Sequence, residues 1–541
     1  MRILAFSVAH DSSVCCIDNG KIEFFCKEER LTGVKRDQVP FKSLELFRSL
    51  NTKHIDHVLY CTPSNSQHDV EGILSMYINK IFDKRMENYS DLKHHDCHMA
   101  LAYSNSNFDE ALVFVVDRNG SSFYIDGHDV ARECESVYRV NKDSINHLQK
   151  NFFITGPTNQ KHIIKNNIQE YYDCKVVCDS EYSVVKVYEA ATTLIGQHPL
   201  ENGKTMGLSS YSTKDNFENL FVDNMPISEK FTGYIGNELG VTFSDSINYI
   251  TDDVNENNYM YYADKAKQVQ VETQNEMLSL IKKYVNETGV KNVCIVGGYG
   301  LNVVANNFYI KNLPDVNFYF EPNADDTGIS LGATILKQYE NTNTWVEGVD
   351  NNFYHYYNDT VVNKGSTTNI KELCDILINK KSLAVFNGSP EAGPRALGHR
   401  SILFDPRNAD TKEIVNRIKN REWYRPFAGV ILEEYFEEYF DTLGYQKSEY
   451  MTINFNAKPH TLNMVPGIVH VDSTCRIQTV NNGFLYDLLQ EFYKLTGCPM
   501  LLNTSFNLAG QPLVQTKLQA LEVLNNSELN HLYFVDENKL L

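Results

Sequence analysis

The sequence predicts a two-domain α/β protein whose larger, N-terminal domain contains an internal repeat. Three observations support this class. The chain has 541 residues, which is too long for one ordinary hydrophobic core. A pattern of strand, acidic loop and hairpin occurs twice in the N-terminal part. A stretch without clear periodicity, residues 346–369, separates the two halves. We therefore expect domains at 1–345 and 370–541, joined by a linker.

The repeat is built around two acidic loops. The apolar run at 3–9 is followed by His10-Asp11-Ser12-Ser13, a second apolar run and a hairpin turn. A similar apolar run at 111–116 is followed by Asp117-Arg118-Asn119-Gly120 and another hairpin. A duplicated nucleotide-binding fold places such loops around a phosphate or a metal. Two unrelated hairpins are the alternative.

A third strand-like run ends in glycines. Residues 291–296 are apolar and lead into Gly297-Gly298, where the backbone can close on a ligand at the start of a helix. The dinucleotide-binding glycine spacing is missing, and no Gly-x-x-x-x-Gly-Lys-Ser/Thr loop occurs in the chain. A Rossmann or P-loop enzyme is therefore disfavoured.

Three histidines fall within the five residues from His94 to His98. On a helix, His94 and His98 project from one face, so two neutral imidazoles could share a metal ion. A solvated helix end or a satisfied core histidine is the alternative. The pair Asp325-Asp326 opens a helix of small residues, where an aspartate can act as N-cap or as an oxygen ligand. Two histidines and one carboxylate are typical of iron or zinc sites that also bind substrate.

Cations of the second domain gather on loops bounded by glycine and proline. Arg395 and Arg400 lie in 388–400 and are expected to project from this loop; Arg425 follows a basic, aromatic stretch, and Arg476 lies in a third cluster. In a chain of net charge −19, three such clusters predict a site for a small phosphorylated anion. A solvated basic face or structural ion pairs are the alternatives.

Composition limits the function classes. The acidic balance argues against broad nucleic-acid binding, although a local basic groove stays open. No apolar run is long enough to span a bilayer, and Met1 leads directly into a strand-like segment, so we expect a cytoplasmic protein. The twelve cysteines form no Cys-x-x-Cys pairs, which predicts buried free thiols.

These motifs resemble the O-carbamoyltransferases of the nodulation-protein and antibiotic-tailoring type. The resemblance runs nearly end to end and rests on His10-Asp11-Ser12-Ser13, Glu28-Glu29-Arg30, the run His94 to Ala100, Gly203-Lys204-x-Met206-Gly207-Leu208, Gly297-Gly298, Asp326-x-Gly328, Gly393-Pro394-Arg395-Ala396-Leu397-Gly398, Arg425-Pro426-Phe427-Ala428 and Leu502-Asn503-Thr504-Ser505-Phe506-Asn507. It implies a duplicated actin-like ATPase domain of the ASKHA class, similar to the tRNA threonylcarbamoyl transferases. A smaller YrdC-like α/β domain that makes acyl-adenylates would follow.

The activity implied by the resemblance is ATP-dependent O-carbamoyl transfer. Carbamoyl phosphate and ATP would give carbamoyl-adenylate, and the carbamoyl group would pass to an acceptor hydroxyl. Fe²⁺ or another divalent metal would serve as cofactor, with Mg²⁺ accompanying ATP. Acceptors of the family include small molecules and sugars, and the class extends to 5-hydroxymethylcytosine in DNA. The acceptor and the number of subunits stay open.

The resemblance also implies residue roles. The metal ligands would be His94, His98, Asp117 and Asp326. Nucleotide contacts would come from Lys35, Asp117, Asn119, Gly120, Gly298, Arg476 and Asn503. Arg395, Arg425 and Ser505 would bind carbamoyl phosphate. For catalysis, His10 or Asp11 is the candidate general base, and Lys419 would offset charge as phosphate leaves.

Two segments depart from the family pattern. His95-Asp96-Cys97 places an acid and a thiol beside the metal ligands, and the stretch after Glu29 is less basic, which bears on Lys35. Two other readings of the chain are a threonylcarbamoyl-type tRNA modification enzyme and a non-catalytic, nucleotide-gated regulator. Dependence on the donor substrate would separate the first from carbamoyl transfer, and ATP binding without turnover would identify the second.

Overall fold

The computed structural model describes residues 1–8, 10–51, 53–62, 68–89, 93–154, 161–179, 183–215, 254–255, 257–346 and 364–541. Contacts divide the chain into two compact units. The first unit comprises Met1–Phe24 and Gln38–Asp350, and the second comprises Phe25–Asp37 and Asn351–Leu541. Both units combine helices with mixed sheets, which confirms the predicted α/β class.

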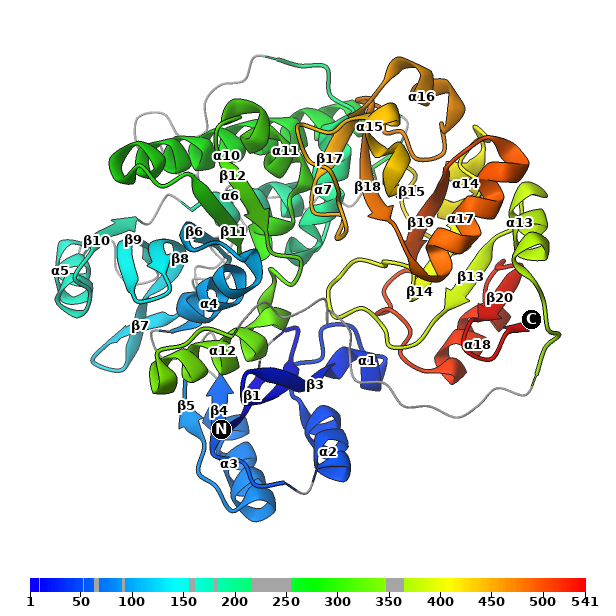
Figure 1. Cartoon of the computed structure of the whole chain (residues 1–541). Helices are drawn as coiled ribbons and strands as arrows, with labels where there is room; N and C mark the ends of the chain where they lie inside the picture. Colours follow the sequence, from blue (N-terminus) through cyan, green and yellow to red (C-terminus); the bar gives the residue numbers. More distant parts are fainter. Residues whose placement is uncertain are drawn as a thin grey trace. The chain divides into compact units, whose positions relative to one another are not determined.

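The first unit contains two sheets that share one order of neighbours (Figure 1). In the sheet β3-β2-β1-β4-β5, strand β1 is antiparallel to β2 and parallel to β4. In the sheet β10-β9-β8-β6-β11-β12, strand β6 is antiparallel to β8 and parallel to β11. The strands are β1 Arg2–Ser7, β2 Ser13–Asp18, β3 Lys21–Lys27, β4 His57–Cys61, β5 Glu87–Asn88, β6 Glu110–Val116, β7 Ser122–Ile125, β8 His128–Asn141, β9 Ile145–Ile154, β10 Lys175–Asp179, β11 Asn292–Val296 and β12 Asn317–Phe320.

Strands β1 and β6 are each followed by one of the predicted acidic loops. Their residues are almost all buried, because helices cover both faces of the sheets, and a strand buried on both faces is continuously apolar rather than alternating. The loop after β1 carries His10 and Asp11, and the loop after β6 carries Asp117. Topology therefore places the two loops at equivalent ends of the central strands.

Helices α4 (His94–Ser106) and α12 (Ile329–Thr342) pack against each other. Helix α12 lies on β1, β2 and β4, and α4 lies on β6, β8 and β11, so the pair is enclosed by the two sheets. This explains why α4 is buried almost all round and lacks a polar face. At Gly332 the helices come so close that a Cβ would lie 2.6 Å from the carbonyl carbon of Cys97.

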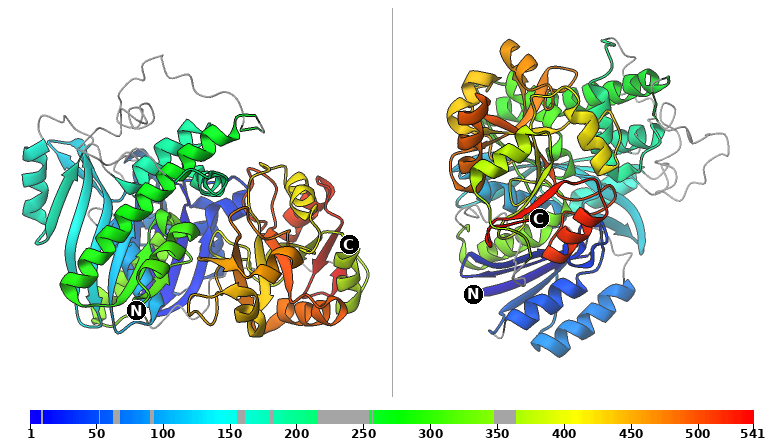
Figure 2. Two further views of the ribbon diagram at one scale, coloured as in Figure 1. Left: turned by 90° about the horizontal axis from the view of Figure 1, so that it is seen from above. Right: turned by 90° about the vertical axis from the view of Figure 1, so that its right-hand side faces the viewer.

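Further helices complete the first unit. The longest is α10, Tyr259–Thr288, drawn in green and seen along its length in Figure 2 (left). It packs on α6, α7 and α11. The other helices are α2 Phe41–Leu50, α3 His68–Phe82, α5 Lys161–Tyr171, α6 Val184–Leu194, α7 Asn202–Ser209 and α11 Val303–Asn312, with 3-10 turns η3 Pro199–Glu201, η4 Gly298–Leu301 and η5 Asp326–Gly328.

The second unit is built on one mixed sheet of order β16-β17-β18-β15-β19-β14-β13-β20-β21. Its strands are β13 Leu383–Phe386, β14 Arg400–Phe404, β15 Ala428–Leu432, β16 Phe440–Asp441, β17 Asn454–Ala457, β18 Thr474–Val480, β19 Met500–Ser505, β20 His531–Phe534 and β21 Lys539–Leu540. Its helices are α1 Glu28–Thr32, α13 Ile370–Ile378, α14 Thr411–Lys419, α15 Phe436–Tyr439, α16 Pro459–Met464, α17 Gly483–Thr496 and α18 Lys517–Asn525, with the 3-10 turn η6 Glu433–Tyr435.

The cysteines agree with the sequence prediction. All twelve are free thiols, and all but Cys174 are buried. Cys97, which lies between the metal-candidate histidines, is fully buried, and burial raises the pKa of its thiol well above the usual value. In the described part of the chain, no helix combines the length and apolar character needed to cross a membrane.

Candidate metal centre and anion site

Four buried side chains of the first unit converge at the ends of α4, β6 and the loop before α12. They are His94, His98, Asp117 and Asp326, and one ligand atom from each lies within 4.8 Å of all the others. His94 Nε2 is 3.4 Å from Asp326 Oδ1 and 3.7 Å from Asp117 Oδ2, and His98 Nε2 is 3.5 Å from Asp326 Oδ1. The structure thus brings together all four residues proposed as ligands from the sequence.

The donor set fits a divalent transition metal. Neither ring nitrogen of His94 or His98 has a hydrogen-bond partner among the described residues. A buried polar atom without a partner costs about 1–3 kcal/mol, so such atoms point to a ligand. Donors bound to one ion at about 2.1 Å lie roughly 3–4 Å from each other, as the three measured separations do. Two imidazoles and two carboxylates suit Fe²⁺ or Zn²⁺.

The two aspartates before α12 have separate roles. The side chain of Asp325 accepts a hydrogen bond from the Thr327 N–H at 3.2 Å and so caps the turn η5. Asp326 is thereby left to face the histidines. The capping role considered for this acidic pair therefore falls on Asp325, and Asp326 is the candidate oxygen ligand.

Backbone donors orient Asp117. Its Oδ1 accepts from the Gly298 N–H at 3.0 Å, and its Oδ2 faces the Asn119 N–H at 3.4 Å. Gly297 has φ +88°, and a Cβ there would lie 2.6 Å from the carbonyl carbon of Val116. The two glycines therefore let the end of β11 approach the end of β6 closely enough to hold the aspartate.

Charge is unevenly balanced among these ligands. Burial alone would lower the pKa of His94, but the carboxylates of Asp326 and Asp117 raise it to about 10. Burial favours neutral Asp326, yet His94 and His98 hold its pKa well below the usual range. The cluster thus binds protons tightly in the absence of another cation. A metal ion would replace those protons, which makes metal binding depend on pH.

His10 and Asp11 lie beside this cluster. His10 Nδ1 is 3.2 Å from Asp11 Oδ2, and His10 Nε2 is 3.7 Å from Asp326 Oδ2. Burial would lower the pKa of His10, but the hydrogen bond to Asp11 and the charge of Asp326 raise it to about 9. A protonated His10 cannot accept a proton, so Asp11 is the better base until a cation beside Asp326 lowers the pKa of His10 again.

The second unit gathers its cations around three adjacent strands, β18, β15 and β19. Ala428 of β15 pairs with Arg476 of β18 on one side and with Asn503 of β19 on the other. Arg425 lies three residues before the start of β15. Asn503 is buried and its Nδ2 donates to the Ala396 carbonyl at 3.1 Å, beside Arg395. Arg476 and Asn503 are therefore held on either side of β15, and Arg395 and Arg425 lie on loops beside them.

Lys419 ends α14 and reaches the end of β19. Its Nζ donates to Ser505 Oγ at 3.1 Å, to Asn507 Oδ1 at 2.8 Å and to the Asn507 carbonyl at 3.0 Å, and it also contacts the Ser505 carbonyl. Burial and the charges of Arg421 and Arg425 lower its pKa well below the usual value. Lys419 and Ser505 are thus in direct contact.

Arg421 belongs to the same group, although the sequence analysis did not select it. Its Nε donates to Asn416 Oδ1 at 2.8 Å, its Nη2 donates to the Pro426 carbonyl at 3.0 Å, and its guanidinium lies 4.1 Å from the centre of the Phe427 ring. The available signal was its spacing of four residues from Arg425 on either side of Trp423-Tyr424. Burial together with Arg395, Arg421 and Arg425 lowers the pKa of Arg476, so these cations repel one another.

The glycine- and proline-rich loop that carries Arg395 is held by two buried residues. Glu391 Oε1 accepts from the backbone N–H groups of Leu397, His399 and Arg400 at 2.6 to 3.2 Å. Arg30 Nη2 donates to the carbonyls of Glu391 and Gly393 at 3.2 and 3.3 Å. Arg30 belongs to the family motif Glu28-Glu29-Arg30, so this contact gives that motif a structural role.

Arg400 does not project from the loop as expected. It is fully buried, donates to the carbonyls of Asn387, Gly388 and Gln515, and lies 3.4 Å from the centre of the Phe386 ring. Arg400, at the start of a central strand, thus donates hydrogen bonds to backbone carbonyl groups and is not a cation of the anion site.

Two further residues predicted to contact the nucleotide, Lys35 and Gly120, differ in their exposure. Lys35 is exposed, in the segment Phe25–Asp37 that groups with the second unit. Gly120 is buried, because the His95 ring lies directly against it.

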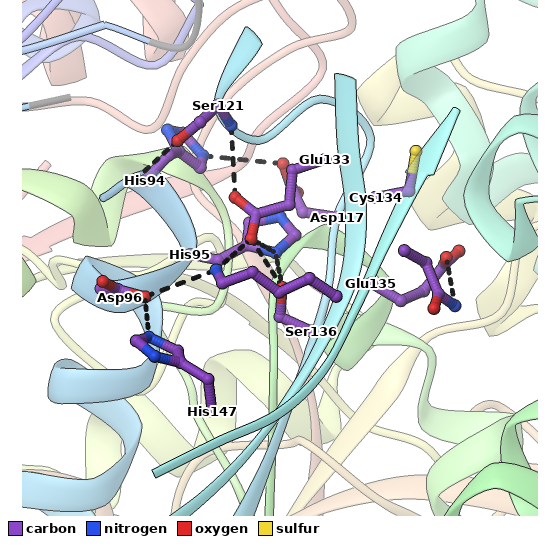
Figure 3. Close-up of polar contacts among 12 residues, drawn as sticks. His94, His95, Asp96, Asp117, Ser121, Glu133, Cys134, Glu135, Ser136 and His147 are labelled. Carbon is purple, nitrogen blue, oxygen red and sulfur yellow. Dashed lines mark hydrogen bonds and ion pairs between the residues drawn. The ribbon is translucent and has the colours of Figure 1, made fainter. Parts of the chain in front are cut away.

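Buried charges of the first unit form a second group that the sequence analysis missed. Glu133, Ser136 and Lys150 of β8 and β9 surround His95 and Asp96 of α4, as Figure 3 shows for most of these residues. In addition, Arg118 Nε lies 2.6 Å from Oε1 of the fully buried Glu189. The available signal was the presence of charged residues inside otherwise apolar strand-like runs.

Comparison with known proteins identifies a family for both parts of the chain. Residues 65–335 match the family described as carbamoyltransferase N-terminus, and residues 374–538 match carbamoyltransferase C-terminus. An uncharacterized protein of Methanocaldococcus jannaschii, MJ1051, is 28% identical over 96% of this chain and 96% of its own length. Nodulation protein NolNO of Sinorhizobium fredii is 24% identical over 97% of this chain and 78% of its own.

Similarity to solved structures is weaker. The HypF protein of T. kodakarensis superimposes with a TM-score of 0.39 at 12% identity, covering 63% of this chain and 48% of that one. This likeness is too low to bear on function. The two family matches fall one in each unit and together include the four converging ligands and the arginine loop. The chain is therefore an enzyme of the carbamoyltransferase family, as the resemblance implied.

Proposed function

We propose that the enzyme activates a carbamoyl group as carbamoyl-adenylate in its second unit and transfers it to an acceptor hydroxyl in its first unit. The first unit would be a duplicated actin-like domain, supported by the shared strand order of its two sheets. The second would be the YrdC-like adenylate-forming domain, supported by the family motifs on its loops.

The observation that carries the proposal is the group of partly buried, mutually repelling arginines around Arg476, with the buried Lys419 beside them. Arg395, Arg421 and Arg425 all lower its pKa, and Lys419 is affected by the last two in the same way. Such a group is stabilised when an anion with several oxygens binds between the cations. Carbamoyl phosphate and the phosphates of ATP are anions of this kind.

The first step has a simple atom balance. Water releases phosphate from carbamoyl phosphate and leaves carbamate, whose oxygen attacks the α-phosphorus of ATP as pyrophosphate departs. Arg395, Arg425 and Ser505 would hold the carbamoyl phosphate, and the Lys419 ammonium would stabilise the charge on the departing phosphate. Arg476 and Asn503 would contact the nucleotide. Carbamate is a poor acyl donor because nitrogen donates into the carbonyl, so a good leaving group is needed before transfer.

The second step takes place beside the four converging ligands. The acceptor oxygen attacks the carbamoyl carbon, its proton passes to Asp11 or His10, and AMP leaves. The backbone around Gly298 and Asn119 would orient the adenylate. A divalent metal held by His94, His98, Asp117 and Asp326 would supply a fixed positive charge for the phosphate or the carbonyl oxygen. Burial of these residues keeps water from competing with the acceptor.

The acceptor class is proposed as a small hydroxyl-bearing molecule, such as a sugar or a hydroxymethyl compound. The net charge of −19 disfavours a polyanion, although hydroxymethylated DNA stays in the test panel. Mass spectrometry after incubation with candidate acceptors would detect the added carbamoyl group.

The decisive test separates the two steps. Full-length protein with ATP, carbamoyl phosphate and Fe²⁺ should release pyrophosphate, and Arg395→Ala should lose this activity. Arg139→Ala, which removes a partly exposed ion pair with Glu110 in the first unit, is the matched control and should retain it. If pyrophosphate release requires threonine and bicarbonate instead of carbamoyl phosphate, the proposed donor is wrong. ATP binding without any AMP formation would contradict an enzymatic role for the second unit.

A further inference from the structure

His95 lies between the candidate ligands His94 and His98 but does not join them. Its ring centre is 6.0 Å from that of His94 and 6.4 Å from that of His98, and the ring is fully buried. Figure 3 shows its ring beside Glu133 and Ser136 of strand β8. A buried imidazole in the first turn of a ligand-bearing helix, yet outside the ligand set, calls for another role.

One edge of the His95 ring is fixed by hydrogen bonds. Its Nδ1 is 2.9 Å from Ser136 Oγ and 3.4 Å from Glu133 Oε1. The Ser136 hydroxyl donates its own proton to Glu133 Oε1 at 2.7 Å, so its oxygen must accept from the His95 Nδ1–H. The tautomer and the ring orientation of His95 are therefore set by this pair.

The other edge of the ring lies against the loop that carries Asp117. A Cβ on residue 120 would be 2.5 Å from His95 Nε2 and 2.6 Å from its Cδ2, so only glycine fits beside this ring. Gly120 also donates its N–H to the Glu133 carbonyl at 2.7 Å. The same residue, Glu133, thus fixes both the imidazole and the glycine that the imidazole touches.

Ser121 adds a second connection between helix α4 and the Asp117 loop. Ser121 Oγ accepts from the backbone N–H of His94 at 3.2 Å, and the Ser121 N–H faces Glu133 Oε2 at 3.4 Å. Helix α4 and the loop 117–121 are therefore joined twice, through Ser121 and through His95. These two segments carry three of the four candidate ligands.

The negative charge of Glu133 is balanced by the ammonium group of Lys150. Lys150 donates to Glu133 Oε1 and, at 3.0 Å, to the Tyr138 hydroxyl, which itself donates to Asp96 Oδ1 at 2.7 Å. His147 Nε2 is 3.2 Å from the same Asp96 oxygen. All of these residues except Asp96 and His147 are fully buried. His95 and Asp96 are thus both hydrogen-bonded to residues of β8 and β9 or to their immediate neighbours in this group.

We infer that His95, held by Ser136 and Glu133, is a positioning residue of the metal centre: it fixes helix α4 and the Asp117 loop at the separation that lets their side chains share one ion. This inference rests on the proposed metal role of the His94 cluster. Residues that orient metal ligands typically change metal affinity about 10- to 100-fold when they are replaced.

The test compares variants of full-length, metal-stripped protein titrated with Co²⁺, followed by calorimetry and by the visible absorption of the bound ion. His95→Ala and Gly120→Ala should each weaken Co²⁺ binding about 10-fold or more and change the absorption spectrum. Glu110→Gln, which alters a partly exposed ion pair between β6 and β8, is the matched control and should bind Co²⁺ as the unaltered protein does.

A conservative exchange sharpens the test. Asparagine places its amide nitrogen near the position of Nδ1, whereas glutamine reaches toward that of Nε2. His95→Asn should therefore keep the Ser136 contact and bind Co²⁺ within about 3-fold of the unaltered protein, and His95→Gln should bind more weakly. Because asparagine leaves room beside residue 120, adding Gly120→Ala to His95→Asn should cost little more. This non-additivity would not arise from general destabilisation.

Several outcomes would overturn the inference. Unaltered Co²⁺ affinity and spectrum in His95→Ala would do so while leaving the metal assignment intact. The inference about His95 would also be overturned if Gly120→Ala weakened Co²⁺ binding equally in the unaltered protein and in the His95→Asn variant. Failure of the unaltered protein to bind Co²⁺ would overturn the metal assignment and the inference together. If His95→Ala does not fold, Ser136→Ala decides: it removes one hydroxyl and should still weaken Co²⁺ binding several-fold, and no change would count against the role of His95.

Discussion

Replacing Gly332 by alanine should disturb the metal centre from a position that touches none of its ligands. Helix α12 meets α4 at this glycine, and a Cβ would lie 2.6 Å from the carbonyl carbon of Cys97 and closer still to its oxygen. Carbon atoms in contact are about 3.5 Å apart, so the two helices must separate by about 1 Å. One helix carries His94 and His98, and the other directly follows Asp326.

The energetic cost follows from this geometry. Overpacking against backbone costs about 3 kcal/mol, and alanine returns about 1 kcal/mol through its higher helix propensity. The net loss of about 2 kcal/mol should lower the melting temperature of the first unit by about 3 °C. A displacement of about 1 Å at a reacting centre can reduce the rate about 100-fold. Carbamoyl transfer should therefore fall by that order, while pyrophosphate release by the second unit persists.

The assay measures both half-reactions and the thermal unfolding of the same protein. Gly72→Ala is the matched control, because Gly72 lies in the exposed part of helix α3 and a Cβ there meets nothing within 4 Å. It should raise stability slightly and leave both reactions unchanged. If Gly332→Ala transfers carbamoyl groups at the rate of the unaltered protein, the close approach of α4 and α12 does not set the geometry of the centre.

Three further predictions concern the pH dependence, the anion site and the metal. Burial raises the pKa of Glu135 from about 4.5 to about 7, so the folded protein holds this proton more tightly than the unfolded chain, and the stability that the proton contributes is lost as the pH rises through that interval. Glu135→Gln should therefore stabilise the protein by up to about 3 kcal/mol at pH 8 but little at pH 4. Equal effects of the substitution on urea unfolding at both pH values would contradict this prediction. Arg421→Lys removes the stacking on Phe427 and should raise the KM for carbamoyl phosphate about 10-fold in a pyrophosphate-release assay, with an unchanged KM counting against its place in the anion site. Removing metal with a chelator, or replacing His94 and His98 together by alanine, should abolish transfer and spare pyrophosphate release; loss of both would refute the division of labour between the units.

Features that depend on local spacing could be predicted from the sequence. His94 and His98 share a face because the helical repeat alone decides it, and the buried strand before Asp117 was recognised from its unbroken apolar run. Asp117 itself was selected through the repeat, and Asp326 through its place before a helix and the family resemblance. Local pattern and chain order were sufficient for these residues.

The surroundings of His95 could not be predicted in the same way. With regular alternation, Glu133 and Glu135 would face the same side of β8. The register between β8 and β9 shifts at this point, so Cys134 is extra, Glu133 and Ser136 meet His95, and Glu135 contacts Ser183 and Val184 instead. A bulge leaves no clear mark in a single sequence. The face of the sheet on which Glu135 and Ser136 lie therefore could not be predicted from the sequence.

The anion site shows a second limit, because part of it comes from a distant segment of the chain. The second unit includes Phe25–Asp37, which begins within the last residues of β3, and there Arg30 donates to the carbonyls of Glu391 and Gly393 in the loop of Arg395. A fragment that starts at residue 364 would lack this arginine and leave those carbonyls without their donor, at about 1–3 kcal/mol for each that stays buried and unpaired. The loop that presents Arg395 therefore needs a residue more than 350 positions earlier in the chain. This explains why the motif Glu28-Glu29-Arg30 accompanies the arginine loop in the resemblance although it lies in the N-terminal part of the sequence, two strands after the His10 and Asp11 loop.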